Sequence, residues 1–273
     1  MNSQTRDPER KPVTVPGLRA MKAEGRKIVM LTAYDASFAS CLDLAGVDVA
    51  LVGDSLGMVV QGHASTLPVT LDQAVYHTAA VARGLSSSLL VADLPFMTDR
   101  DPAHALEAAH RLMAEGGAAM VKLEGAGHIC VVIEALTERN VPVCAHLGLT
   151  PQAVHRLGGY RVQGREADVA ERIFDDARAV AAAGAQMLVL EAVPAELARR
   201  ITGELAIPVI GIGAGADTDG QVLVVYDMLG ITPGKRPKFS KDFLREHGSV
   251  VAAMAAYADD VRAGRFPGPK HQY

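Results

Sequence analysis

Ionisable side chains stand at the carboxyl ends of five successive apolar runs in this sequence. Each run is short and rich in Val, Ile, Leu and Ala, and the residues in question are Asp54, Asp93, Lys122 with Glu124, His146, and Glu191. Because Lys122 and Glu124 are two residues apart, their side chains leave the same face of a strand. The repetition indicates one shared polar site.

Three carboxylates within this set point to a divalent cation. Burying Asp54, Asp93 and Glu124 together is costly, because desolvation and like charge both oppose it. A hard ion with oxygen ligands resolves the conflict, and a donor set without cysteine favours Mg²⁺ over zinc. Taken singly, each residue has an ordinary explanation as a turn former, a helix cap or a buried histidine. That explanation has to hold at five equivalent positions in turn.

The elements that must position these residues form a regular alternation. Near-continuous apolar runs are typical of parallel strands buried on both faces. Segments 102–118 and 168–185 carry apolar residues at helical spacing and end in Gly. The pattern predicts one α/β domain, a (β/α)₈ TIM barrel, which gathers the strand ends at one rim. A doubly wound open sheet is the alternative. The eight expected strands are 27–35, 47–54, 88–96, 118–125, 141–148, 186–193, 207–215 and 221–230.

Several residues outside the main set receive separate interpretations. Asp35 precedes a helical segment and is expected to be its N-cap. Asp227 stands at the end of the eighth expected strand without a recognisable partner and is interpreted as structural. The GIGAG at 211–215 has two explanations, a phosphate-binding turn or close approach of the backbone to a ligand. The long loops after the second and fifth strands are expected to act as lids.

Composition limits the classes of function. The chain has 273 residues, is 49% hydrophobic and carries a formal net charge of -4, which argues against nucleic acid or an anionic membrane as partner. No apolar run is long enough for a transmembrane helix, and the N-terminus does not have the pattern of a signal peptide. Three widely spaced cysteines predict reduced thiols and a cytoplasmic location. We expect a flexible leader at residues 1–16, then a catalytic domain at 17–273 with a C-terminal helix.

Seven motifs together resemble the ketopantoate hydroxymethyltransferase family from about Arg19 to Gly268. No single motif is specific, but all occur in the family's order. They are VGDSLGMVVQGHASTLPVT (52–70), HTAAVARG (77–84), ADLPFM (92–97), MVKLEG (120–125), AHLGLTPQ (145–152), GGYRVQGR (158–165) and VIGIGAG (209–215).

The resemblance implies a reaction and a metal site. It implies a Mg²⁺-dependent barrel that transfers a hydroxymethyl group from 5,10-methylenetetrahydrofolate to 3-methyl-2-oxobutanoate. The product is 2-dehydropantoate, on the way to pantothenate and coenzyme A. Asp54 and Asp93 match the metal-binding aspartates, which also contact substrate, and Glu124 matches the carboxylate that completes the metal site. The resemblance further implies a large homo-oligomer, of the size of a decamer.

The remaining roles follow from the same resemblance. Ser55 and Lys122 match contacts to the oxo acid, Glu191 matches the proton acceptor, and His146 matches a motif histidine placed at the substrate. Two alternatives stay open. One is a barrel lyase of the phosphoenolpyruvate mutase and isocitrate lyase kind, which acts on an oxo acid through a Mg²⁺-bound enolate. The other is a barrel that has become a non-enzymatic binding protein.

Overall fold

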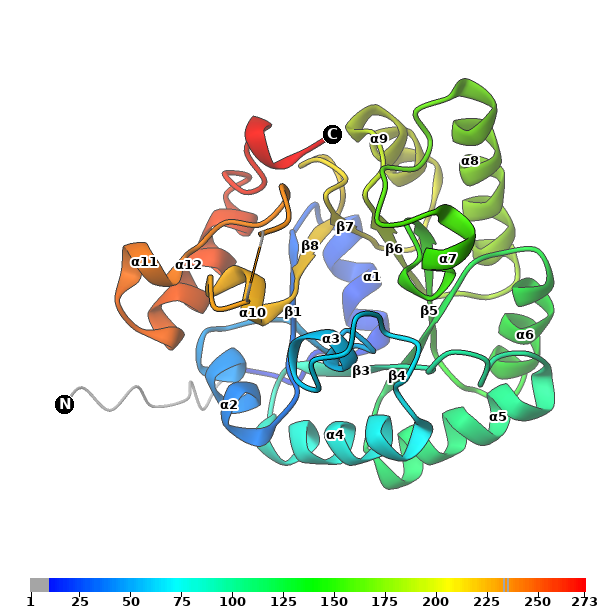
Figure 1. Cartoon of the computed structure of the whole chain (residues 1–273), viewed down its shortest axis with the longest axis horizontal. Helices are drawn as coiled ribbons and strands as arrows, with labels where there is room; N and C mark the ends of the chain where they lie inside the picture. The colour runs from blue at the N-terminus through cyan, green and yellow to red at the C-terminus, as the bar shows by residue number, and fades with distance from the viewer. Residues whose placement is uncertain (1–9, 233, 235) are drawn as a thin grey trace.

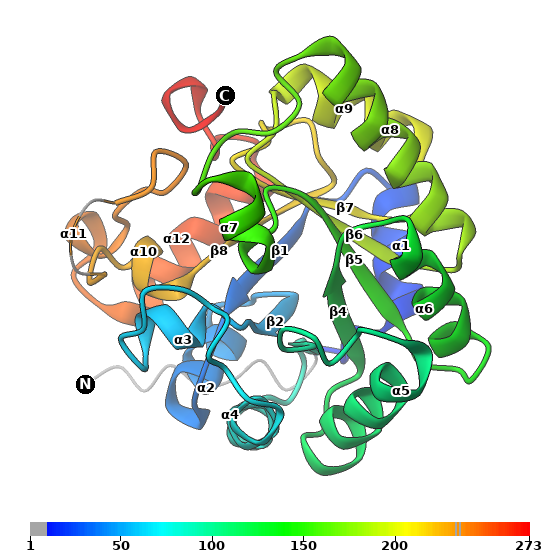
Figure 2. The same ribbon diagram turned by 45° about the vertical axis from the view of Figure 1, so that its right-hand side comes forward.

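Eight parallel strands close into a barrel in the computed structural model, which describes residues 10–232, 234 and 236–273 (Figures 1 and 2). The strands follow one another around the barrel in chain order, and β8 closes it against β1 with Met30 opposite Val222. The predicted single-domain (β/α)₈ fold is confirmed. The strands are β1 Ile28–Thr32, β2 Val49–Val52, β3 Leu89–Asp93, β4 Met120–Glu124, β5 Val143–Gly148, β6 Met187–Glu191, β7 Val209–Ile212 and β8 Gly220–Leu223.

The strands are apolar because both of their faces are covered. Every residue of β1 to β4 is buried, including the charged residues at the ends of β3 and β4. One face packs inside the barrel and the other lies against the surrounding helices, so a polar alternation would place polar groups in the core. The charged residues of the strands therefore stand between the middle of a strand and its carboxyl end, as Lys122 and Glu124 do in β4.

Helices surround the barrel, and polar side chains fix where several of them begin. Asp35 accepts a hydrogen bond from the Phe38 amide at 2.9 Å and caps α2 as predicted. Thr70 and Gln73 form a capping box at the start of α4. The helices are α1 Val15–Ala23, α2 Ala36–Leu44, α3 Leu56–Val59, α4 Leu71–Gly84, α5 Pro102–His110, η1 Arg111–Glu115, α6 His128–Thr137, η2 Pro151–Ala153, α7 Val154–Leu157, α8 Ala167–Ala182, α9 Ala195–Glu204, α10 Val225–Met228, α11 Leu244–His247, α12 Val250–Arg262 and η3 Pro269–His271.

The eighth strand is shorter than its apolar run suggests. The run 221–230 continues past Leu223, but the Val225 amide donates to the Thr32 hydroxyl at 2.9 Å, and the chain turns into α10. Asp227 therefore lies in a short helix and not at a strand end. The connection between β7 and β8, residues 213–219, also contains no helix, although this part of the chain is fully described.

The glycines of β7 and the following loop allow close packing. Gly213 has φ +63°, and a Cβ there would lie 2.9 Å from the Phe239 ring and 3.1 Å from the Tyr273 ring. Gly213 is therefore explained by close packing against side chains of the protein itself, which neither interpretation of the GIGAG motif anticipated.

The N-terminal end of the barrel is closed by α1, which lies behind the strands in Figure 1. Leu18 and Met21 are buried, and Lys22 pairs with Asp219, the residue before β8, at 2.6 Å. Residues 1–9 of the expected leader lie outside the described residues, and the Val13 amide donates to the Ser87 carbonyl at 2.8 Å. The domain boundary at residue 16 stays a prediction. Within the described residues, no helix has the length and apolarity to cross a membrane.

Candidate active site

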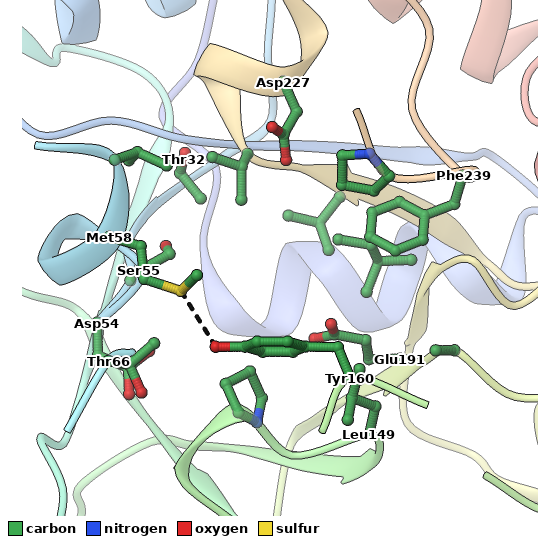
Figure 3. Close-up of a pocket in the computed structure, with 18 of the residues that line it drawn as sticks. Thr32, Asp54, Ser55, Met58, Thr66, Leu149, Tyr160, Glu191, Asp227 and Phe239 are labelled. Carbon is green, nitrogen blue, oxygen red and sulfur yellow. Dashed lines mark hydrogen bonds between the residues drawn. The ribbon is translucent and has the colours of Figure 1, made fainter. Parts of the chain in front are cut away.

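A cavity of about 950 Å³ opens at the C-terminal rim of the barrel, where the strand ends meet (Figure 3). Residues from β3 to β6 and from the loops after β2 and β5 contribute to its walls. The structure brings all the predicted site residues to this one cavity: Asp54, Ser55, Asp93, Lys122, Glu124, His146 and Glu191. Because they come from five successive strand–loop units, only closure of the barrel brings them together.

Asp54, Asp93 and Lys122 form a buried charged group. Lys122 Nζ lies 2.8 Å from Asp93 Oδ1, and the Asp54 amide donates to Asp93 Oδ2 at 2.9 Å. Each of the three side chains is about 95% buried. Asp93 thus touches both the backbone of the β2 loop and the ammonium group on β4.

Glu124, His146 and Glu191 form a second line across the cavity. His146 Nδ1 lies 3.3 Å from Glu124 Oε1, and His146 Nε2 lies 3.3 Å from Glu191 Oε2. Burial and the nearby Lys122 ammonium would lower the pKa of His146, but the two carboxylates outweigh them and raise it to about 9. The Lys122 ammonium also lies 3.2 Å from His146 Nδ1, and His146 Nε2 has no well-aligned hydrogen bond among the described residues.

Gln152 joins the two groups, and the sequence reasoning assigned it no role. Its side-chain amide donates to Asp54 Oδ2 at 2.9 Å and to the Leu94 carbonyl at 3.0 Å, while its backbone amide donates to Glu124 Oε2 at 3.0 Å. Gln152 lies in η2, in the loop after β5. Its place in the AHLGLTPQ motif was the only available signal, because its partners lie far away in the sequence.

The carboxylates of this site outnumber its cationic side chains. Burial, Asp93 and Glu124 together raise the pKa of Asp54 to about 8. Burial also raises the pKa of Asp93 in spite of its contact with Lys122. Burial alone would lower the pKa of Lys122, but the surrounding carboxylates raise it, so the ammonium stays charged. The site therefore holds more carboxylate than its own cations neutralise.

The carboxylate oxygens fit a divalent cation. Asp93 Oδ1 and Glu124 Oε1 are buried and have no well-aligned hydrogen bond among the described residues. No three Asp, Glu, His or Cys side chains of this described part converge tightly enough to hold an ion alone. Mg²⁺ commonly takes only one or two carboxylates and fills its shell with water or substrate oxygens. The arrangement suits an ion whose coordination a bound substrate completes.

The two long loops meet over the cavity. The Tyr160 hydroxyl, in the loop after β5, donates to Met58 Sδ in α3 at 3.3 Å, the contact drawn dashed in Figure 3. Ser55 begins α3 without capping it, and its hydroxyl lies 2.9 Å from the Tyr34 hydroxyl. This leaves the Ser55 side chain directed into the cavity and not into the helix end.

Asp227 also lines the cavity, which its interpretation as a purely structural residue did not anticipate. It is 7% exposed and points into the open space from α10, above Tyr160 in Figure 3. The apolar run 221–230 predicted Asp227 at a strand end, whereas the chain leaves β8 at Leu223 and turns into α10, which carries Asp227 over the rim.

The fold and the site define a (β/α)₈-barrel enzyme whose rim gathers buried carboxylates and one buried lysine. Solved structures with the same fold include phosphonopyruvate hydrolase in a complex with oxalate and Mg²⁺, with TM-score 0.61 and 15% identity over 95% of this chain and 93% of that one. Phosphoenolpyruvate phosphomutase from Streptomyces platensis subsp. rosaceus gives TM-score 0.60 and 16% identity over 80% and 83% of the two chains. At this identity the likeness concerns the fold alone.

The chain belongs to the ketopantoate hydroxymethyltransferase family, whose sequence profile matches residues 12–269. A 3-methyl-2-oxobutanoate hydroxymethyltransferase from Xanthomonas euvesicatoria pv. vesicatoria (strain 85-10) is 61% identical over 96% of this chain and 97% of its own length. The protein of that name from Shewanella halifaxensis (strain HAW-EB4) is 56% identical over 96% and 98%. The resemblance seen in the motifs is confirmed.

Proposed function

We propose that this chain transfers a hydroxymethyl group from 5,10-methylenetetrahydrofolate to 3-methyl-2-oxobutanoate and so forms 2-dehydropantoate for pantothenate and coenzyme A synthesis. The observation that carries the proposal is the group of three buried carboxylates around Lys122 at the rim, in a member of the hydroxymethyltransferase family. An anionic oxo acid needs both a cation to receive its oxygens and a base beside its C3 atom. This group and Glu191 offer the two together.

Asp54 and Asp93 hold Mg²⁺ in this proposal, and Glu124 completes the site. Asp93 Oδ1 and Glu124 Oε1 have ion-pair contacts to Lys122 and His146 but no well-aligned hydrogen bond, and this and the raised pKa of Asp54 support the role. When bound, Mg²⁺ supplies a Lewis acid that draws electron density from the keto oxygen of the substrate. Gln152 holds Asp54 and Glu124 in place through its side-chain and backbone amides.

Lys122 and Ser55 contact the oxo acid. The Lys122 ammonium stays charged at the centre of the site, where it can stabilise the negative charge of the substrate carboxylate and of the developing enolate. The Ser55 hydroxyl can donate to a substrate oxygen, because it faces the cavity and is not consumed as a helix cap. Ser55 follows the proposed metal ligand Asp54 in the chain, and Lys122 pairs with the proposed ligand Asp93 on the neighbouring strand.

Glu191 removes the C3 proton of the oxo acid. Its carboxylate lies on the cavity wall, on the far side of His146 from Glu124. His146 Nε2 lies 3.3 Å from Glu191 Oε2 and can orient this carboxylate toward the substrate. Water adds to the methylene bridge of the folate and breaks its C–N5 and C–N10 bonds, which releases tetrahydrofolate and a formaldehyde unit. The enolate carbon then attacks the formaldehyde carbon, and the alkoxide that forms takes up a proton to give the hydroxymethyl group.

A lyase acting on a related oxo acid is the alternative. Lyases of the phosphoenolpyruvate mutase and isocitrate lyase kind share this barrel, but the expected reactive cysteine is not among the residues that line the cavity. Cys144 is buried, and Cys41 and Cys130 are free thiols away from that wall. This observation favours the transferase.

A steady-state assay with each substrate omitted in turn tests the proposal. We expect product only when the oxo acid, methylenetetrahydrofolate and Mg²⁺ are all present, and loss of turnover in excess EDTA. Turnover of an oxo acid without folate would support the lyase instead. Mass-spectrometric detection of 2-dehydropantoate identifies the product directly.

The cytoplasm as the site of action and assembly into a large homo-oligomer belong to the same proposal. The free thiols of the three cysteines support a reducing compartment. Sedimentation velocity measures the assembly, and a monomer at micromolar concentration would contradict it.

A further inference from the structure

Asp227 is a buried carboxylate that the proposed chemistry leaves unused. Its Oδ1 accepts a hydrogen bond from the Thr232 hydroxyl at 2.6 Å. Its other oxygen has no hydrogen bond or ion pair to any of the residues that the structure describes. The side chain nevertheless faces the cavity and is 7% exposed. A buried carboxylate with a free oxygen is stable only if donors reach it.

No nearby cation of the described chain fills that oxygen. Arg236 lines the same cavity, but its guanidinium pairs with Asp242 at 3.1 Å. Burial raises the pKa of Asp227, while the Thr232 hydrogen bond and the more distant Arg236 oppose the shift. The contact with Thr232 accounts for one oxygen only. The other is available to a ligand.

Apolar side chains line part of the cavity away from the carboxylate end, together with Thr232, Arg236 and Lys238 from the segment after α10. Ile212, Val222, Val224 and Phe239 line it, and Tyr160 lies across from Asp227 in Figure 3. The cavity of about 950 Å³ is far larger than a small oxo acid requires and is in the range of sites for drug-sized ligands. Apolar walls with one carboxylate suit a flat heterocycle that carries adjacent N–H donors.

We propose that Asp227 binds the N3–H and 2-amino edge of the pterin ring of the folate co-substrate. This inference rests on the proposed function, because it assigns the second substrate of that reaction to the apolar end of the cavity. Two neighbouring N–H donors match the two oxygens of a carboxylate, as they do in bidentate pairs. N5, to which the one-carbon unit is attached, lies on the opposite side of the pterin from the 2-amino group. Anchoring the 2-amino edge at Asp227 leaves N5 on the part of the ring system away from Asp227, inside the cavity that Glu191 also lines.

Tetrahydrofolate and its 2-desamino-2-methyl analogue are the probes, and calorimetry measures their dissociation constants. The wild-type protein should bind the analogue about 10²-fold more weakly, because a site built for a donor rejects a ligand that lacks it. Asp227→Asn should weaken tetrahydrofolate about 10²-fold and remove most of the difference between the two ligands. Asp217→Asn is the matched control, since Asp217 is exposed and outside the cavity, and it should behave as wild type.

The outcomes separate this inference from the proposed function. A wild-type protein that makes product with methylenetetrahydrofolate yet binds both probes equally would overturn the Asp227 assignment alone. A protein without folate-dependent turnover would overturn both. If Asp227→Asn fails to fold, as judged by its circular dichroism and oxo-acid binding, the wild-type comparison of the two probes still decides the question. Thr232→Val, which keeps the carboxylate, should retain discrimination between them.

Discussion

The two ends of the barrel treat buried carboxylates in opposite ways. At the N-terminal end, Asp43 accepts hydrogen bonds from the backbone amides and hydroxyls of Ser86, Ser87 and Ser88. At the C-terminal rim, Asp93 and Glu124 each keep a buried oxygen without a well-aligned donor among the described residues. Burial opposes ionisation at both ends. Hydrogen bonds outweigh it at Asp43 and lower that pKa. At the rim, burial raises the pKa of Asp54 and Asp93, whereas the pKa of Glu124, next to His146, is lowered.

Other N-terminal carboxylates follow the pattern of Asp43. Asp48 accepts from the Val29 amide at 2.9 Å and pairs with Arg262 at 3.2 Å. Asp219 accepts from the Val209 amide and pairs with Lys22. These carboxylates connect loops that precede the strands, and their oxygens accept hydrogen bonds and ion pairs from the protein. A carboxylate that stabilises the fold is therefore surrounded by hydrogen-bond donors of the protein. A carboxylate that binds a ligand lacks some of these donors.

The largest effect should come from removing a rim carboxylate. Asp54→Ala and Asp93→Ala should each reduce kcat/KM by about 10⁴-fold or more, because the proposed ion loses a ligand. Steady-state kinetics and Mg²⁺ titration measure the loss. Asp101→Ala, at an exposed helix cap, is the control. Near-normal turnover and Mg²⁺ affinity in either rim variant would remove that residue from the metal site.

Glu191→Gln separates the role of the base from the role of the metal ligands at the rim. Enolate formation requires only the oxo acid, Mg²⁺ and a base, so proton NMR in D₂O can follow loss of the C3–H signal without folate. The variant keeps the size of the side chain but cannot accept the proton, and exchange should fall by about 10²–10⁴-fold. Oxo-acid affinity should hardly change. Exchange at the wild-type rate would make His146 the next candidate for the base.

Lys122→Met should have a smaller effect on catalysis than loss of a metal ligand. It removes the buried ammonium without touching the carboxylates, and we expect about 10²-fold lower kcat/KM with weaker oxo-acid binding. The carboxylates around Lys122 lose a counter-ion in this variant, so we also expect the site to depend more strongly on bound Mg²⁺. Unchanged KM and kcat would return Lys122 to a structural role.

Asp43 tests the other end of the barrel through pH. Burial would raise its pKa, but the serine hydrogen bonds outweigh this and lower it. A lowered folded-state pKa stabilises the protein above the unfolded value of about 4, and this contribution is lost as the pH falls through the folded-state pKa. The difference in unfolding free energy between wild type and Asp43→Asn, from urea denaturation, should therefore shrink below about pH 4. A difference that stays constant with pH would contradict the assignment.

The sequence predicted the barrel and the ionisable strand ends because both depend on local pattern. Apolar runs marked the strands, and parallel topology then required Asp54, Asp93, Glu124 and Glu191 to meet at one rim. The exit from β8 could not be predicted, since it depends on the distant Thr32 hydroxyl.

Roles that depend on distant partners escaped the sequence reasoning. Gln152 reaches Asp54 and Glu124 across the barrel, and Asp43 reaches the three serines before β3 across a helix–loop contact. In both cases the residue types are ordinary, and only tertiary proximity gives them a function.

The most direct test of the contrast between the two ends compares Asp54→Asn with Asp43→Asn in urea denaturation, first with EDTA and then with Mg²⁺ and oxo acid. With EDTA, Asp43→Asn should be less stable than wild type by about 2–4 kcal/mol, because buried donors lose their acceptor. Asp54→Asn should be at least as stable as wild type, by up to about 4 kcal/mol, because folding of the wild type must either bury a repelled charge at Asp54 or take up a proton there. Mg²⁺ and oxo acid should stabilise wild type and Asp43→Asn but not Asp54→Asn. Equal destabilisation by both substitutions in EDTA would contradict the account.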